Sequence, residues 1–205
     1  MLYKPYGYLS TFTDPEGRPT LGRLVKVPER IYAAGRLDMD SEGLLLLTND
    51  GELVHRLTHP RYEHPKEYWV QVEGVPTEEA IKALRLGVEI RGGRTAPAEV
   101  ERLAEPPAGL PERPVRENVP KTWLRVVLRE GRKRQVRHMT AAVGYPTLRL
   151  VRVAIGPLKL GNLRPGEWRD LTDRELRDLW RMAGGPRVQG PPAGRQRQAE
   201  TRQVG

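Results

Sequence analysis

Cysteine is absent from the 205 residues, which excludes a disulfide framework and any metal site built on thiolates. The sequence also lacks an apolar run of membrane-spanning length, and its N-terminus lacks the charged and then apolar layout of a signal peptide. These absences favour a cytoplasmic protein with no membrane partner. Because 38% of the residues are apolar, the chain can still bury a real core, and we expect one domain of at most two lobes.

Acidic residues are too few to balance the basic ones. The formal net charge is +9 and the sequence pI is about 10.1, which indicates a polyanionic partner such as nucleic acid. The tail 184–205 holds four arginines and one glutamate, so most of the excess charge belongs to the rest of the chain. This tail is otherwise rich in Gly, Pro and Gln, and we predict that it is disordered.

An acidic stretch precedes the most apolar run of the chain. Asp38, Asp40 and Glu42 come just before four leucines at 44–47, and an Asn-Asp-Gly turn follows the leucines. A short apolar run between turn signals predicts a strand that is buried on both faces, so we expect the acidic cluster to lie in the loop before it. Loops held by rigid strands commonly carry catalytic groups.

Several interpretations of this loop compete. A solvated turn is the simplest for any single Asp. A calcium loop matches its first half only, because Asn49 stands where the EF-hand needs a bidentate Glu and the flanking segments are not helical. A glycosidase-type acid and base pair needs a carboxyl separation that sequence does not give. No metal site is expected at His55, His59 and His64 either, because no further ligand is spaced to complete one.

Periodicity places the remaining elements. Residues 66–73 alternate as a half-buried strand, with Tyr68 among the inward positions. The loop 104–121 holds five prolines, and its arginines either grip RNA phosphates or are merely solvated. A strand at 122–129 leads into a basic segment with a helix at 132–143. The other expected elements are strands at 31–34, around Gly92-Gly93, at 146–160 to close the sheet and at 166–169, and helices at 52–58, 77–86 and 172–182.

Short motifs occur in a fixed order along the chain. They are Lys4-Pro5-Tyr6-Gly7, Gly35-Arg36-Leu37-Asp38, Ser41-Glu42-Gly43-Leu44-Leu45, Lys66-Glu67-Tyr68, Glu130-Gly131-Arg132 and Arg134-Gln135-Val136-Arg137. Together they resemble the RsuA/RluB/RluE family of RNA pseudouridine synthases over about residues 1 to 180. The resemblance implies an α+β pseudouridine synthase fold with a mostly antiparallel mixed sheet, flanking helices and an active-site cleft between two lobes. It also implies that residues 1–183 form the catalytic domain.

The resemblance assigns roles at the site. Asp38 is the expected nucleophile on a flipped-out base, and attack on the base or on the sugar both stay open. Arg137 is expected to keep Asp38 ionised, and Arg36 to hold the flipped nucleotide or its phosphate. Tyr68 is expected to stack on the uracil and to take part in proton transfer. The implied RNA-binding residues are Arg36, Lys4, Arg132, Lys133 and Arg134, and no cofactor is implied.

The substrate implied by the resemblance is 23S rRNA or a large-subunit precursor. The chain starts almost at once with the first motif, so we expect no S4 RNA-binding domain, and the branch of the family without that domain is the most similar. A rival hypothesis is a non-catalytic rRNA-binding or ribosome-assembly factor on the same scaffold. We expect a monomer.

Overall fold

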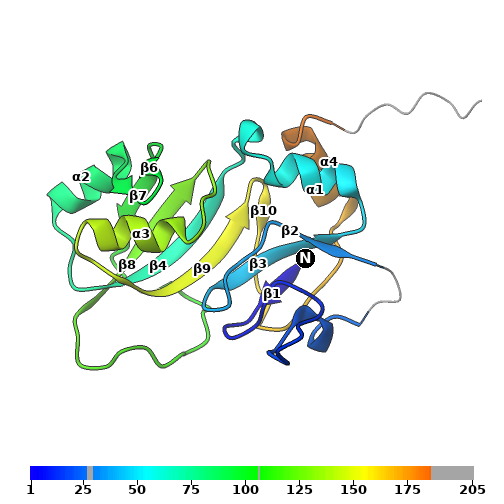
Figure 1. Cartoon of the computed structure of the whole chain (residues 1–205), viewed down its shortest axis with the longest axis horizontal. Helices are drawn as coiled ribbons and strands as arrows, with labels where there is room; N and C mark the ends of the chain where they lie inside the picture. The colour runs from blue at the N-terminus through cyan, green and yellow to red at the C-terminus, as the bar shows by residue number, and fades with distance from the viewer. Residues whose placement is uncertain (27–29, 106, 186–205) are drawn as a thin grey trace, which may run out of the picture.

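The computed structural model describes residues 1–26, 30–105 and 107–185 (Figure 1). Its main sheet has the strand order β1-β3-β9-β4-β8-β7. The bounds are β1 Leu2–Lys4, β3 Glu42–Thr48, β9 Thr147–Ile155, β4 Lys66–Glu73, β8 Lys121–Leu128 and β7 Glu99–Arg102. Only the β3–β9 pair among these neighbours is parallel. The predicted α+β class with a mostly antiparallel mixed sheet is therefore confirmed.

Helices lie at both ends of this sheet (Figure 1). Helices α2 and α3 lie near β4, β7 and β8, whereas α1 and α4 lie together near β2 and β3. The helices are α1 Gly51–Thr58, α2 Glu78–Leu86, α3 Gln135–Ala142 and α4 Asp173–Met182, with 3₁₀ turns η1 Leu21–Arg23 and η2 Pro60–Tyr62. The remaining strands are β2 Tyr32–Ala34, β5 Glu89–Ile90, β6 Gly93–Arg94 and β10 Leu158–Lys159. None of the helices in the described ranges is long and apolar enough to span a bilayer.

The strand β4 divides its side chains between two apolar clusters. Val70 and Val72 are fully buried in one cluster, which Tyr68 joins at its edge. Trp69 faces the other cluster, which includes Val151 and Leu44. This alternation follows from the period of two along a strand, so the predicted half-buried strand at 66–73 is confirmed.

The predicted position of the segment 146–160 is wrong. We expected it to close the sheet, but β9 lies between β3 and β4 and is buried along most of its length. Two of its basic residues, Arg149 and Arg152, are only 4% and 3% exposed. Each guanidinium is satisfied inside the protein, Arg149 by Glu42 and Arg152 by the backbone carbonyls of Leu44 and Gly35.

Other boundaries differ in smaller ways. The helix predicted at 132–143 begins at Gln135, because Arg134 has the left-handed φ of 52° and cannot continue a helix backwards. The strand predicted at 166–169 is reduced to one bridge between Leu2 and Trp168. The predicted disorder of the tail concerns residues 186–205, which lie outside the described part of the chain.

The capping box of α4 gives a testable pH effect. Thr172 and Glu175 form the box, and Arg169 hydrogen-bonds Glu175, which lowers the pKa of this carboxyl from 4.5 to about 2. A carboxyl with a depressed folded-state pKa stabilises the protein above its unfolded pKa and stops doing so as the pH falls through the folded value. We therefore expect Glu175→Gln to melt below wild type at pH 7, with the gap narrowing from pH 4.5 to 2 in thermal scans. A gap that is independent of pH would contradict this assignment.

Candidate active site

The loop 35–41 connects β2 to β3 and is fixed by the N-terminal segment. The hydroxyl of Ser10 donates to the Leu37 carbonyl at 2.7 Å and accepts from the Leu37 amide at 3.0 Å. The Gly7 amide donates to the Met39 carbonyl at 2.8 Å, and the Ser41 amide closes a turn onto the Asp38 carbonyl. We call residues 35–41 the Asp38 loop. Its backbone is therefore held on both sides of Asp38.

Gly43 lies in β3 and allows this strand to pack closely against β9. Its φ is 103°, and an added Cβ would lie 2.2 Å from the backbone oxygen of Arg152. Only glycine permits this close parallel approach of β3 to β9. The approach fixes the end of the Asp38 loop against the centre of the sheet.

A cavity of about 830 Å³ opens beside the Asp38 loop. It is bounded by the segment 9–18, by β4 and by the segment that leads into α3. Its volume is in the range of sites that bind small ligands. The predicted site residues that line it are Arg36, Asp38, Tyr68, Arg132, Lys133 and Arg134. The structure thus brings the predicted nucleophile and the predicted stacking tyrosine to one cavity.

The cation in contact with Asp38 differs from the predicted one. A guanidinium nitrogen of Arg134 lies 3.7 Å from the Asp38 carboxylate. The same guanidinium binds Asp40 through two hydrogen bonds of 3.0 and 2.7 Å. Arg137, the expected partner of Asp38, instead donates to the backbone carbonyls of Asp40 and Thr147 at 2.7 and 3.2 Å. The predicted Asp38–Arg137 pair is therefore wrong as a direct contact.

Asp40 forms ion pairs with both Arg134 and Arg137. Burial alone would raise the pKa of Asp40, but the hydrogen bonds from Arg134 and the charge of Arg137 outweigh it and hold this pKa below its ordinary value. Burial lowers the pKa of Arg137, and the Asp40 charge opposes that effect. The Nε atom of Arg137 is buried without a hydrogen-bond partner among the described residues. Arg137 thus pins the Asp38 loop to β9.

Glu42 does not belong to the loop, contrary to the predicted acidic cluster. It is the first residue of β3, is 3% exposed, and accepts two hydrogen bonds of 2.8 and 2.9 Å from Arg149. Arg113 adds a third contact at 3.1 Å, so this arginine of the loop 104–121 serves an internal ion pair. A buried carboxylate with two guanidinium partners is a structural group, because its lone pairs are already used.

Lys4 is not an RNA-binding side chain. It is fully buried, and its ammonium donates to the carbonyls of Pro5 and Tyr8. Burial lowers its pKa to about 8, although Glu42, Asp40 and Asp38 oppose the shift. Lys4 therefore shapes the segment that supports the Asp38 loop, and the predicted RNA contact is wrong.

The other predicted RNA-binding residues differ in exposure and in the hydrogen bonds that their side chains make. Arg132 hydrogen-bonds the carbonyls of Gly93 and Arg94 and so holds the β5–β6 hairpin. Lys133 and Arg36 are exposed and make no hydrogen bond or ion pair with the described residues. Sequence reasoning missed Ser10 and the internal roles of Arg149 and Arg152. Basic residues within an otherwise apolar strand were the available signal for the two arginines.

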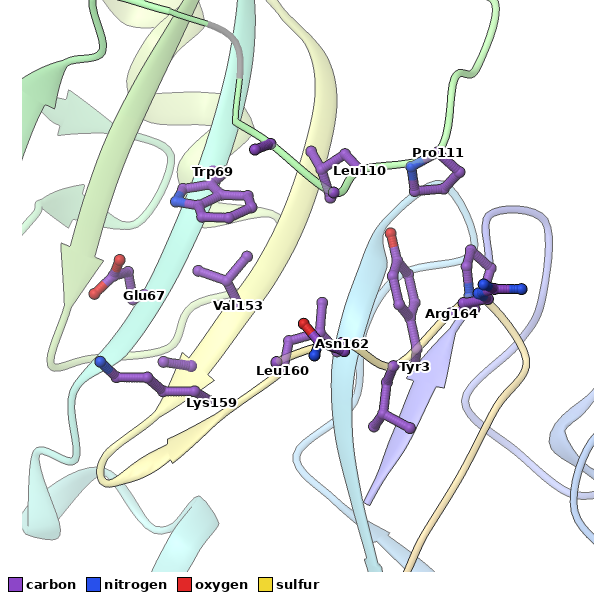
Figure 2. Close-up of a pocket in the computed structure, with 16 residues that line it drawn as sticks. Tyr3, Glu67, Trp69, Leu110, Pro111, Val153, Lys159, Leu160, Asn162 and Arg164 are labelled. Atoms are coloured by element: carbon purple, nitrogen blue, oxygen red, sulfur yellow. The ribbon is translucent and has the colours of Figure 1, made fainter.

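A second cavity of about 730 Å³ is lined by Trp69 of β4 (Figure 2). Because successive side chains of a strand point to opposite faces, this cavity and Tyr68 lie on opposite sides of β4. Trp69, Val153 and Leu160 give it an apolar lining, and Lys159 and Arg164 lie at its edge. Glu67 is the one acidic residue among the described residues that line this cavity, and it is paired with Arg125. It therefore offers no free carboxylate for covalent chemistry.

The histidines predicted not to bind metal form ring contacts. His55 and His59 have centroids 5.0 Å apart, and His64 stacks on Tyr62 at 5.7 Å. Over the part of the chain that is described, no three His, Cys, Asp or Glu side chains are grouped like a metal site.

Comparison with protein-family models places the chain in a class of RNA-modifying isomerases. A family model described as RNA pseudouridylate synthase matches residues 1–142. This match spans well over half of the chain, and the chain belongs to the RNA pseudouridylate synthase family.

Curated relatives narrow the comparison. A protein of Xanthomonas campestris pv. campestris named "Ribosomal large subunit pseudouridine synthase E" is 56% identical over 174 residues, which cover 82% of this chain and 92% of the relative. A protein of the same name from Vibrio vulnificus is 54% identical over 171 residues, which cover 82% of this chain and 73% of the relative. The resemblance to the RluE branch is thereby confirmed.

Solved structures agree with the fold. A crystal structure of a pseudouridylate synthase superposes with a TM-score of 0.74 at 32% identity, and covers 87% of this chain and 71% of that chain. An H/ACA ribonucleoprotein bound to a substrate RNA containing 2′-deoxyuridine superposes with a TM-score of 0.52 at 19% identity, over 80% of this chain and 49% of that chain. The second similarity concerns the fold alone.

Proposed function

We propose that this protein isomerises a specific uridine of large-subunit (23S) rRNA to pseudouridine, and that Asp38 is its nucleophile. One observation supports this most strongly: Asp38 projects into a cavity together with Tyr68, in a chain 56% identical to a relative named for this activity. The substrate is carried over from the relatives' names. A cytoplasmic location with the ribosome and a monomeric state belong to the same proposal.

The reaction breaks the bond between ribose C1′ and uracil N1, turns the base and forms a bond from C1′ to C5. The proton on C5 then leaves, and N1 ends with a proton in place of the ribose. No atom is lost and nothing is oxidised, so the chain's own residues supply the chemistry. A target base within structured RNA must leave its stack to be reached, and the cavity of about 830 Å³ is large enough to receive it. The Asp38 carboxylate then forms a transient bond to the base or to the sugar.

The surroundings of Asp38 suit this role. Its side chain is 36% exposed, so an RNA base can reach it, and Arg134 lies 3.7 Å away. Asp40 engages Arg134 more closely than Asp38 does, and Asp38 therefore keeps a free oxygen for attack.

Tyr68 is assigned to the base itself. It lines the cavity at a bulge of β4, from which its ring is available for stacking on uracil. We expect Tyr68→Phe to bind RNA like wild type and to lose about 100-fold in single-turnover rate, because the ring is kept while the proton-transferring hydroxyl is removed. Tyr62→Phe is the control for loss of a phenol. Full activity of Tyr68→Phe would limit this residue to stacking.

The test of the proposed function is incubation of the protein with 23S rRNA transcripts and with rRNA from cells lacking the gene, followed by mapping of pseudouridines. A single new pseudouridine in large-subunit rRNA is the expected result. Tight rRNA binding without any product from the wild-type protein would instead favour the non-catalytic assembly factor.

A further inference from the structure

A small basic pocket adjoins the active-site cavity and has no part in the chemistry described above. Its volume is about 200 Å³, and it shares Arg36, Tyr68 and Arg132 with the cavity. On its other side it is bounded by the segment between α1 and β4, cyan in Figure 1. We call it the basic pocket. Its cationic residues are Arg36, Lys66, Arg129, Arg132 and Arg152.

The acids at the basic pocket do not balance these cations. Glu63 and Glu130 are the two that line it. The Glu130 carboxylate already accepts from the Ala96 amide and from Gln135, and its contact with Arg132 is 3.3 Å long. The pocket therefore carries an uncompensated positive charge.

The ammonium of Lys66 has no carboxylate partner among the described residues. Its one hydrogen bond to them is to the His64 carbonyl, at 3.3 Å. Burial lowers the pKa of Lys66, and the charge of Arg152 lowers it further, with no carboxylate opposing the shift. Arg129 is exposed and also makes no hydrogen bond or ion pair within the described ranges. A half-buried ammonium of this kind is stabilised when an anion binds beside it.

We propose that the basic pocket binds a backbone phosphate of the RNA strand immediately next to the target uridine, through Arg129, Lys66 and Arg36. Its lining of five cations and two acids suits an anionic phosphate group better than a neutral base. Because it shares Arg36 and Tyr68 with the cavity, a strand whose base occupies the cavity passes directly over it. This inference rests on the proposed function for the identity of the target base.

Arg129→Ala tests the pocket against a matched control. Arg164→Ala removes another exposed arginine, from the cavity on the opposite face of the sheet (Figure 2). The probe is single-stranded oligouridylate, whose affinity is measured over a range of salt concentrations. We expect Arg129→Ala to weaken binding about 5-fold or more and to make the log-log salt slope shallower by about 0.7, the value for one lost contact to a single strand. Arg164→Ala is expected to leave both unchanged.

A second measurement localises the phosphate. An rRNA fragment that carries the target uridine is made with one neutral methylphosphonate linkage, placed in turn at each linkage around the target. We expect one adjacent linkage to weaken binding to wild type and to cause no further loss in Arg129→Ala or Lys66→Met. Equal effects of Arg129→Ala and Arg164→Ala on oligouridylate, or additive losses at every linkage, would overturn the proposal. Oligouridylate binding needs no turnover, so an inactive wild type would refute the proposed function and leave this test intact.

Discussion

Asp38→Asn is expected to form no measurable pseudouridine while it binds RNA at least as tightly as wild type. The amide keeps the shape of the side chain but has no anionic oxygen to attack carbon. Removal of a nucleophile costs on the order of 10⁴-fold or more in other enzymes. RNA affinity should not fall, because the substitution removes a negative charge from a cavity that receives a polyanion. Single-turnover assays at saturating rRNA fragment, with parallel binding measurements, check both parts.

The matched control is Asp178→Asn, a carboxylate on the surface of α4 whose ion pairs are with Arg174 and Arg181. It should retain the wild-type rate. An Asp38→Asn protein that still turns over within tenfold of wild type would remove Asp38 from its catalytic role.

Arg137→Ala is expected to lower the single-turnover rate by about 100-fold while the protein stays folded. The Arg137 guanidinium joins the carbonyls of Asp40 and Thr147, so its loss releases the Asp38 loop from β9. A displacement of about 1 Å at a reacting group costs roughly this factor. The two carbonyls left without donors cost about 1–3 kcal/mol, or several degrees in melting temperature for a chain of this size.

Two further variants separate a positioning role of Arg137 from a role in stability. Arg137→Lys retains the charge but spans only one of the two carbonyls, and we expect intermediate activity. Arg174→Ala, on the exposed face of α4, should change neither rate nor melting temperature. The rate of Arg137→Ala is measured at temperatures well below its melting transition, where the variant is folded. A wild-type rate there, or a change in RNA affinity alone, would show that the residue has no positioning role.

Elements with local signals were predictable from sequence. The helix α2 runs from Glu78 to Leu86 with Thr77 as its cap and Gly87 after it, and α4 has the predicted capping box. Caps, glycine stops and short periodicities act over a few residues, so the sequence alone contains them. The strand β4 was predictable for the same reason.

The centre of the sheet was not predictable in this way. The place of β9 depends on its pairing with β3 more than a hundred residues earlier, and no local pattern encodes a partner at that distance. The basic residues of β9 are buried, and a carboxylate and two backbone carbonyls compensate them inside the protein. Glu42 was misplaced for the same reason, since its partner Arg149 is 107 residues away.

At the site, several residues named from the motif resemblance lie around one cavity, but the predicted contact between Asp38 and Arg137 is wrong. Asp38, Arg36 and Tyr68 line one cavity as expected. The choice between Arg134 and Arg137 as the partner of Asp38 depends on the left-handed backbone at Arg134, which turns the segment before α3. Arg134 lies three residues before Arg137, and only the three-dimensional arrangement shows which one reaches Asp38.

The most direct measurement is a crystal structure of Asp38→Asn bound to an rRNA fragment that contains the target uridine. The account predicts that the uracil lies flipped out in the cavity against Tyr68, with its reacting carbon within about 3.5 Å of the residue 38 side chain. A uridine that stays stacked in the RNA, or that occupies the cavity lined by Trp69 on the opposite face, would contradict it.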